Sequence, residues 1–120
     1  MAGNARHVYK ILTSVPPVPI PRDLTEVDTA DGFIHLSTAQ QVPATVSRFF
    51  VNEQKLFIVT ISLAKLDAGP GALKWEGSGS HGVFPHLYDA DIQAESVVET
   101  KEYARAGGEK WGDVLKGLEE

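Results

Sequence analysis

The chain has 120 residues, of which 42% are hydrophobic and 22% are charged, and this composition predicts one globular domain over residues 1–120. A formal net charge of −5 argues against binding of duplex nucleic acid through a broad basic surface. Cysteine is absent, which excludes disulfides and thiolate metal sites, and the sequence has neither an apolar run of about 20 residues nor a signal-peptide pattern. We therefore expect a soluble cytoplasmic protein with no membrane partner.

The first predicted element is a strand over residues 6–13, RHVYKILT, in which Tyr9 and Ile11 alternate with Val8, Lys10 and Leu12. The next nine residues, 14–22, contain four prolines, which remove amide donors and predict a loop.

A second strand is predicted over residues 32–38, after a turn at Asp31 and Gly32. Alternation places Ile34 and Leu36 on one face of this strand. The other face would carry Phe33, His35 and Ser37.

A helix is predicted from about residue 38 to residue 52, with Thr38 as its cap and Pro43 in its first turn. Its apolar stripe should consist of Val42, Val46, Phe49 and Phe50. Its polar stripe should consist of Gln41, Thr45 and Arg48.

The second half of the chain alternates short strands with turns. Residues 55–62, KLFIVTIS, predict a central strand that is covered on both faces. After this strand we expect a helical turn at 63–67, a brief strand at 73–76, a loop at 77–82, a late strand at 95–103 and a helix at 109–118. The order β, β, α, β, β, β, α predicts an α+β fold with a mixed or antiparallel sheet, one main helix and a short C-terminal helix.

The candidate site begins with His35 and Ser37 on one strand face and Thr38 at the helix start. Amides at a helix start favour negative groups and hydroxyls add neutral donors, so this set suits an anionic or sugar-bearing ligand. The alternative is a hydrogen-bonded structural histidine.

Two later segments add candidate residues. Trp75 offers a stacking surface that suits a nucleotide base. The neighbouring Glu76 offers a carboxylate that suits a ribose hydroxyl or a developing oxocarbenium ion. The alternative places Trp75 in the core and Glu76 in water. In FPHLY, His86 and Tyr88 are further ligand candidates on opposite or twisted faces, and a structural role is the alternative.

Arg48 has two candidate roles besides that of a surface charge: it pairs with a carboxylate such as Asp31, or it meets a ligand phosphate. A zinc site from His81 and His86, completed by His35 and Glu76, lacks a cysteine pair and the HExxH pattern, so we expect no metal. A serine hydrolase with Ser37 lacks the G-x-S-x-G elbow.

Taken together, VYKI, DGFIHLSTAQQV, SRFF, LFIVTI, KWE and FPHLY resemble the family called domain of unknown function 952 over roughly residues 8–98. The resemblance implies a fold similar to that of ADP-ribosyltransferases and RNA 2'-phosphotransferases, in which a split sheet holds NAD or an ADP-ribosylated intermediate. Lys10 or Thr13 stands where such enzymes carry a first-strand histidine, and Glu76 precedes the late strand that carries their glutamate.

The leading hypothesis is therefore a domain that binds a nucleotide-like ligand, with NAD as the implied cofactor, and that catalyses an ADP-ribosyl or related transfer. The cleft that binds the ligand should be lined by His35, Ser37, Thr38, Trp75, Glu76 and His86, with Gln41, Arg48 and Tyr88 nearby. His35 and Glu76 would be the catalytic pair, and loss of His35 should damage ligand binding more than loss of any other histidine. The second hypothesis is a ligand-sensing or adaptor domain without catalysis.

Overall fold

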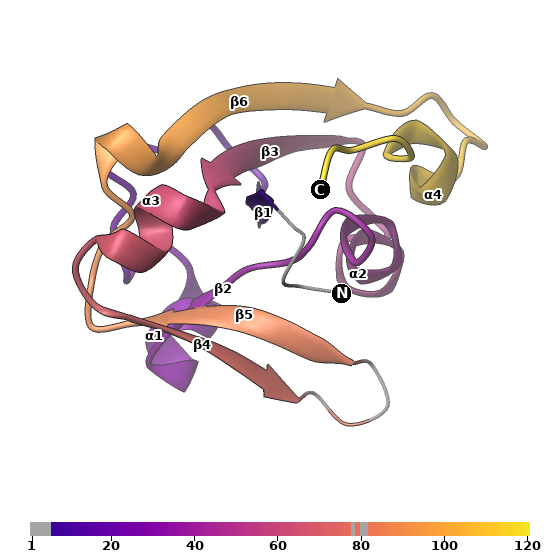
Figure 1. Ribbon diagram of the computed structural model, residues 1–120. Coiled ribbons are helices and arrows are strands. Elements are labelled where there is room, and N and C mark those ends of the chain that lie inside the picture. The colour runs from indigo at the N-terminus through magenta and orange to yellow at the C-terminus, as the bar shows by residue number, and fades with distance from the viewer. Residues whose placement is uncertain (1–5, 78, 80–81) are drawn as a thin grey trace.

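The computed structural model describes residues 6–77, 79 and 82–120, and this part of the chain forms two three-stranded sheets with short helices around them (Figure 1). Every strand pairing is antiparallel. The elements in chain order are β1 His7–Leu12, α1 Glu26–Asp31, β2 Ile34–His35, α2 Val42–Phe49, β3 Lys55–Ser62, α3 Leu63–Ala68, β4 Ala72–Gly77, β5 Val83–Tyr88, a 3-10 turn Ala94–Ser96, β6 Val97–Ala104 and α4 Trp111–Val114. The α+β prediction is confirmed, and the strands form two small antiparallel sheets.

The first sheet has the strand order β1-β3-β6. Its central strand β3 has the bounds that the sequence predicted, because its run of β-branched and apolar residues suits a strand with both faces covered. β1 pairs with β3 along its whole length, from His7 opposite Ser62 to Leu12 opposite Phe57. A register shift between Thr60 and Ile61 interrupts the pairing of β3 with β6.

The second sheet has the order β2-β5-β4, so the central strand is β5. The sequence analysis assigned no strand to FPHLY, and this omission was wrong. Pro85 lies in β5 where the pairing with β2 ends: the amide of Leu36 donates to the carbonyl oxygen of Pro85 over 3.1 Å, and proline has no amide to return this bond. β2 spans only Ile34–His35, much less than the predicted residues 32–38.

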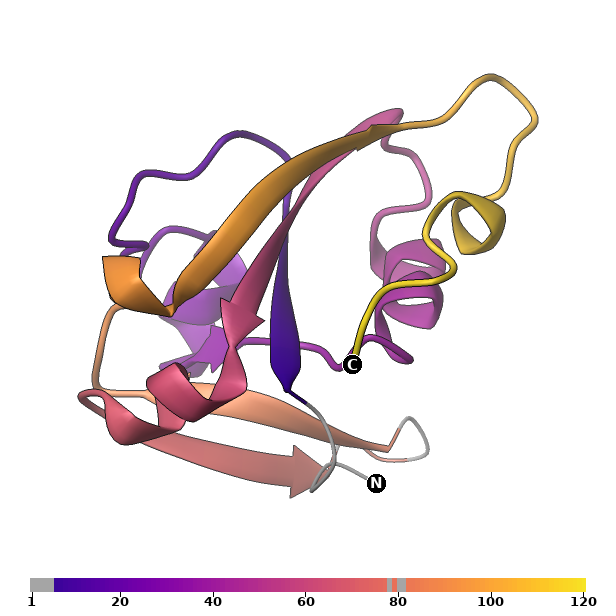
Figure 2. The same ribbon diagram turned by 45° about the horizontal axis from the view of Figure 1, so that its top comes forward.

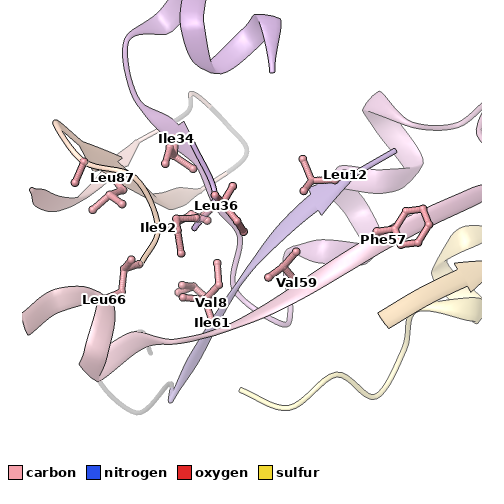
Figure 3. Packing of buried hydrophobic residues seen from close by; sticks show 12 residues of the cluster. Val8, Leu12, Ile34, Leu36, Phe57, Val59, Ile61, Leu66, Leu87 and Ile92 are labelled. Atoms are coloured by element: carbon pink, nitrogen blue, oxygen red, sulfur yellow. The ribbon is translucent and has the colours of Figure 1, made fainter. Parts of the chain in front are cut away.

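The main core lies between the two sheets (Figure 3). It is built from one face of each, and α3 lies beside it (Figures 1 and 2). The fully buried members include Val8, Val59, Ile61, Ile34, Leu87 and Ile92. Ile34 and Leu36 thus face the core, as their alternation predicted.

The outer face of the first sheet is covered by α2 and α4, which lie together at one end of the molecule (Figures 1 and 2). The second cluster combines Tyr9 and Ile11 of β1 with side chains of β3, α2 and α4: Leu56, Ile58, Val42, Val46, Trp111 and Leu115. β1 therefore divides its side chains between two clusters, and β3 is covered on both faces, as predicted.

α2 begins after a reciprocal pair of hydrogen bonds. The amide of Gln41 donates to the Oγ1 of Thr38 over 3.3 Å, and the amide of Thr38 donates to the Oε1 of Gln41 over 3.0 Å. The pair has the pattern of a capping box and closes the turn that leads into α2. The N-cap of α2 itself is Gln41 and not the predicted Thr38, and the Gln41 side chain makes no cap hydrogen bond. The helix ends at Phe49, earlier than predicted, and Phe49 is 67% exposed, so its assignment to the apolar stripe was wrong. The backbone leaves the helical conformation at Phe50, and Phe50 packs against the second cluster.

α1 was not predicted from the sequence. The side chain of Thr25 caps its first turn by accepting from the amide of Asp28, and Gly32 ends it in the left-handed conformation with φ 81°. Glycine adopts this conformation without the strain that a Cβ would add. The predicted helix at 109–118 is shorter in the structure, where α4 spans Trp111–Val114. No helix in the described ranges is long and apolar enough to cross a membrane.

Candidate functional site

The outward face of the second sheet gathers the titratable and aromatic side chains of the candidate site. His35 of β2 stands directly opposite His86 of β5 in the strand register, and Ile34 stands opposite Leu87 on the core side. Since successive residues of a strand point to opposite faces, the apolar residues bury while the histidines face out. We call this surface the histidine face. It consists of Phe33, His35, Glu76, His86 and Tyr88.

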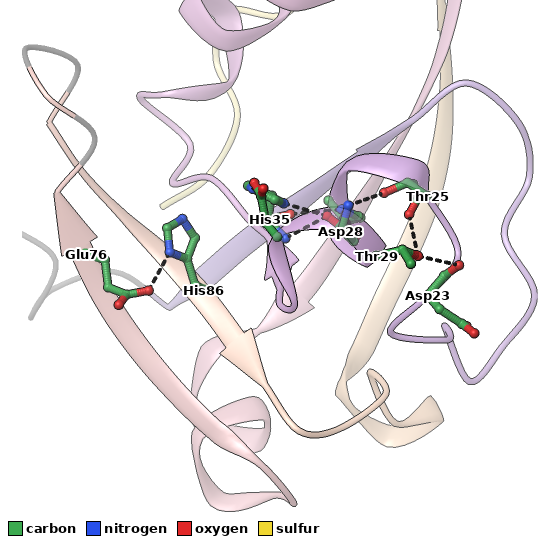
Figure 4. A network of polar contacts seen from close by, with 9 residues as sticks. Asp23, Thr25, Asp28, Thr29, His35, Glu76 and His86 are labelled. Carbon is green, nitrogen blue, oxygen red and sulfur yellow. Dashed lines mark hydrogen bonds and ion pairs between the residues drawn. The ribbon is translucent and has the colours of Figure 1, made fainter.

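Glu76 of β4 holds two members of this face (Figure 4). Its Oε1 lies 2.7 Å from the Nδ1 of His86 and accepts a hydrogen bond of 2.6 Å from the hydroxyl of Tyr88. His86 and Tyr88 therefore lie on the same face of β5, and the prediction of opposite or twisted faces was wrong. Their separation by two residues gives the period of a strand.

The Phe33 ring fills the space between the two histidines and the tyrosine. Its centroid lies 4.1 Å from that of His86 in a stacked arrangement, 4.5 Å from that of His35 and 5.0 Å from that of Tyr88. The two histidine rings are 5.5 Å apart and meet edge to face. Aromatic contacts of this kind restrict ring rotation, so the imidazoles are held in defined orientations.

His35 is bound by two carboxylates of α1 (Figure 4). Its Nδ1 lies 2.6 Å from the Oδ1 of Asp28, and its Nε2 lies 2.8 Å from the Oδ2 of Asp31. The backbone amide of His35 also donates to Asp28. An ionised carboxylate only accepts hydrogen bonds, so each of these contacts requires a hydrogen on the ring nitrogen that makes it.

A buried ion pair lies beneath His35. The Nζ of Lys10, on β1, donates to the Oδ2 of Asp28 over 2.6 Å and to the carbonyl oxygen of His35 over 3.1 Å. Lys10 is 4% exposed and Asp28 is 1% exposed. The pair thus links the first sheet, α1 and the second sheet, and every buried polar side-chain atom of the described residues has a hydrogen-bond partner.

The environment of this pair changes the acidity of both groups. Burial lowers the pKa of the Lys10 ammonium, and the adjacent Asp28 carboxylate opposes this change only in part. Burial by itself would raise the pKa of Asp28, but the hydrogen bonds from His35 and the charge of Lys10 outweigh it and hold that pKa below its usual value. Asp28 therefore acts as an ionised acceptor for the Lys10 ammonium and the His35 ring.

At the other side of the histidine face, hydrogen bonds change the pKa values of Glu76 and Tyr88 more than burial does. Those from Tyr88 and then from His86 lower the pKa of Glu76. The hydrogen bond between Tyr88 and Glu76 also raises the pKa of Tyr88, because it stabilises the protonated phenol. Lys74 adds a cation here, with its Nζ 4.8 Å from the centre of the Tyr88 ring.

Four of the predicted site residues therefore meet: His35, Glu76, His86 and Tyr88. Ser37 does not join them, since it is 4% exposed and its backbone pairs with Tyr9. Thr38 and Gln41 form the start of α2, and the side-chain amide of Gln41 donates to the carbonyl oxygen of Val83 over 2.7 Å. These three residues hold the backbone beside the histidine face, and their contact with a ligand stays a prediction.

Trp75 lies on the opposite side of β4 from Glu76, and Arg48 lies on α2. Trp75 is partly buried and packs against the main core, as the alternative expected, whereas Glu76 is held by His86 and Tyr88 and not by water alone. Trp75 neighbours Glu76 in β4, and neighbouring strand residues point to opposite sides. Arg48 lies on α2 with its guanidinium 4.6 Å from the centre of the Phe49 ring.

Asp28 was not predicted as a supporting residue, and Lys10 was predicted without a partner, whereas Phe33 was predicted on the same face as His35. A signal for Asp28 exists in the sequence, because Thr25 as a cap and Gly32 as a terminator enclose a short helix that places Asp28 in its first turn. Nothing local connects Lys10 with Asp28, which are 18 residues apart.

Metal binding was considered for His81, His86, His35 and Glu76. His81 lies outside the described residues. Within the described part of the chain, no group of three or more histidine, cysteine, aspartate or glutamate side chains is placed to hold a metal ion.

Comparison with curated proteins finds no match for this chain. Among solved structures, the crystal structure of protein CC0527 from Caulobacter crescentus is similar, with 29% sequence identity and a TM-score of 0.67 over 91% of this chain and 97% of that one. A double mutant of the same protein gives 28% identity and the same TM-score and coverage. The family model described as "Protein of unknown function (DUF952)" matches residues 20–100, and the chain therefore belongs to this family.

Proposed function

We propose that the protein binds a nucleotide-like ligand on the histidine face and catalyses a transfer reaction at its ribose, with NAD as the first ligand to test. The observation that carries this proposal is the pair His35 and His86, with ring centres 5.5 Å apart and each Nδ1 held by a carboxylate. An oriented imidazole can accept or donate a proton, and histidine is the side chain most often used for this near neutral pH.

The rest of the face supports the same ligand class. The rings of Phe33 and Tyr88 offer apolar and π surface for a base, and the ammonium of Lys74 supplies a positive charge at the edge. The fold similar to ADP-ribosyltransferases that the family resemblance implies adds NAD and ADP-ribose to the candidates. Phosphorylated RNA ends share the same phosphate and ribose groups.

A ligand sensor without turnover is the second candidate. It is favoured by the position of Glu76, whose Oε1 is engaged by His86 and Tyr88. A carboxylate held in this way orients its partners, whereas a transferase glutamate has to face the reacting sugar carbon.

Two measurements test the proposal. Amide NMR spectra are recorded with NAD, ADP-ribose and a phosphorylated RNA end at millimolar concentration, and shifts are expected at Phe33, His35 and His86. Multiple-turnover release of nicotinamide from NAD then separates the transferase from the sensor. A Glu99→Gln variant on the exposed strand β6 is the control and should match the wild type. If none of the three ligands shifts the spectra, the proposal fails.

A further inference from the structure

The two histidines of the face differ in how many of their ring nitrogens are occupied. Both nitrogens of His35 meet carboxylates, at 2.6 and 2.8 Å. In His86 only Nδ1 is occupied, by Glu76 at 2.7 Å. No hydrogen bond or ion pair of the described residues involves the Nε2 of His86. Since every buried polar side-chain atom of the described residues has a partner, this nitrogen reaches the surface.

The proton of the His86 ring is assigned by its partner. Glu76 accepts a second hydrogen bond from the Tyr88 hydroxyl, as an ionised carboxylate does. The Nδ1 of His86 must then donate to Glu76 and carry a hydrogen. In the neutral ring, Nε2 is left with a free lone pair.

The direction of that lone pair is fixed as well. The His86 ring stacks on Phe33 at a centroid distance of 4.1 Å and an interplanar angle of 29°. Its strand β5 is the central strand of the second sheet, and the neighbouring Leu87 is buried in the core. A carboxylate that orients an imidazole on a rigid element is the arrangement that general bases require.

We propose that the Nε2 of His86 accepts a hydrogen bond from a hydroxyl group of the ligand and takes its proton during transfer, with Glu76 as a positioning residue. This deepens the proposed function and rests on it. With NAD as the ligand, the hydroxyl oxygen forms a bond to the ribose carbon C1′ and its proton passes to Nε2. The glycosidic bond between C1′ and nicotinamide breaks, and its electron pair leaves with nicotinamide. The site therefore takes a ligand or acceptor that offers a hydroxyl group.

The first test needs no ligand. Long-range proton–nitrogen NMR of protein labelled with ¹⁵N-histidine reports which ring nitrogen carries the hydrogen. The neutral form of His86 is expected to carry it on Nδ1, with Nε2 unprotonated. In Glu76→Ala this preference should be lost, whereas Glu99→Ala, on the exposed part of β6, should keep the wild-type signals. A hydrogen on Nε2 of neutral wild-type His86, or a signal that Glu76→Ala leaves unchanged, overturns the proposal.

The second test uses ADP-ribose as the probe. Its addition should shift the Nε2 resonance of His86 more than either ring resonance of His35. If ADP-ribose shifts the amides of Phe33 and His35 and leaves the His86 Nε2 unchanged, the proposal fails although ligand binding stands. If ADP-ribose, NAD and the RNA end all fail to bind, the proposed function fails, and the hydrogen position on His86 still decides whether Glu76 orients the ring as argued.

Discussion

The Nζ of Lys10 lies 2.6 Å from the Oδ2 of Asp28, and this buried contact joins β1 of the first sheet to the helix that orients His35. Asp28 accepts from Lys10 through one oxygen and from His35 through the other. A single carboxylate thus connects the core to the candidate site. A disturbance of the pair should consequently affect both stability and the position of His35.

Lys10→Met is expected to lower the free energy of unfolding by about 3–5 kcal/mol, because it leaves a buried carboxylate without its cation. Chemical denaturation monitored by circular dichroism measures the loss. Lys116→Met, at an exposed position, is the matched control and should stay within about 0.5 kcal/mol of wild type.

The double variant Lys10→Met with Asp28→Asn should be less destabilised than the sum of the single changes, since removal of both charges leaves no uncompensated ion. Additive losses would contradict the view that Lys10 and Asp28 stabilise the fold as a pair.

Stability should also fall in acid. The folded-state pKa values of Asp28 and Glu76 lie below their ordinary values of 3.8 and 4.5. Between the folded and unfolded pKa, the unfolded chain binds more protons, so both groups contribute stability that is complete above the unfolded pKa and is lost as pH falls through the folded one. Urea unfolding from pH 6 downward should show the decline beginning below about pH 4.5.

Two variants separate the sources of this decline. In Asp28→Asn, the free energy of unfolding should depend less on pH in the lower part of this range, because the buried carboxylate no longer titrates. Glu76→Gln should change the curve less, since the Glu76 side chain is 38% exposed and water screens its interactions. An unchanged pH dependence in Asp28→Asn would rule out Asp28 as a main source.

The sequence predicted the structure most accurately where an element depends on a local pattern of residues. β3 was placed correctly because an unbroken run of β-branched and apolar residues has few alternatives to a covered strand. Residues 34–36 were placed correctly because one face is wholly apolar. His35, Glu76 and His86 were selected as titratable groups near strands, and antiparallel pairing of β2, β5 and β4 brings them together.

What the sequence left out depends on contacts between distant segments. α1 has six residues and little apolar periodicity, so only its caps identify it. The pairing of β5 with both β2 and β4 is set by packing of the second sheet on the first, which no window of the sequence contains. Trp75 and Glu76 were assigned to the same site because they are adjacent in the sequence. Adjacent residues of a strand, however, point to opposite faces of the sheet.

The turn after α1 gives a third prediction. Gly32 has φ 81°, and a Cβ added there would meet no atom within 4 Å, so Gly32→Ala tests backbone strain without a clash. We expect a loss of roughly 1–2 kcal/mol in the free energy of unfolding. Gly112→Ala in α4 is the control, because it also meets no atom but should be neutral or stabilising by up to about 1 kcal/mol.

NMR of the Gly32→Ala protein should also show changed ring signals for His35, since the turn carries Asp31 toward its Nε2. Equal thermal stability of the Gly32→Ala and Gly112→Ala proteins would contradict the strain argument.

The last prediction concerns which histidine matters most for ligand affinity. His35→Ala should raise the dissociation constant for ADP-ribose at least about tenfold, equivalent to roughly 1.4 kcal/mol. Without the ring, Asp31 loses the hydrogen bond from His35 and Asp28 loses the bond from Nδ1, so two less compensated negative charges lie beside the ligand phosphates. His86→Ala removes one acceptor nitrogen and should weaken affinity by a smaller factor.

Stability measured beside affinity separates binding from folding. His35→Ala should also lose about 1–3 kcal/mol, because buried Asp28 loses one of its hydrogen-bond donors. In His86→Ala, Glu76 keeps its bond from Tyr88 and its contact with solvent, so no buried charge is left unpaired. Isothermal titration calorimetry with ADP-ribose, carried out on variants shown to be folded, gives the comparison. Wild-type affinity in folded His35→Ala would remove His35 from the ligand site and leave the buried network as its role.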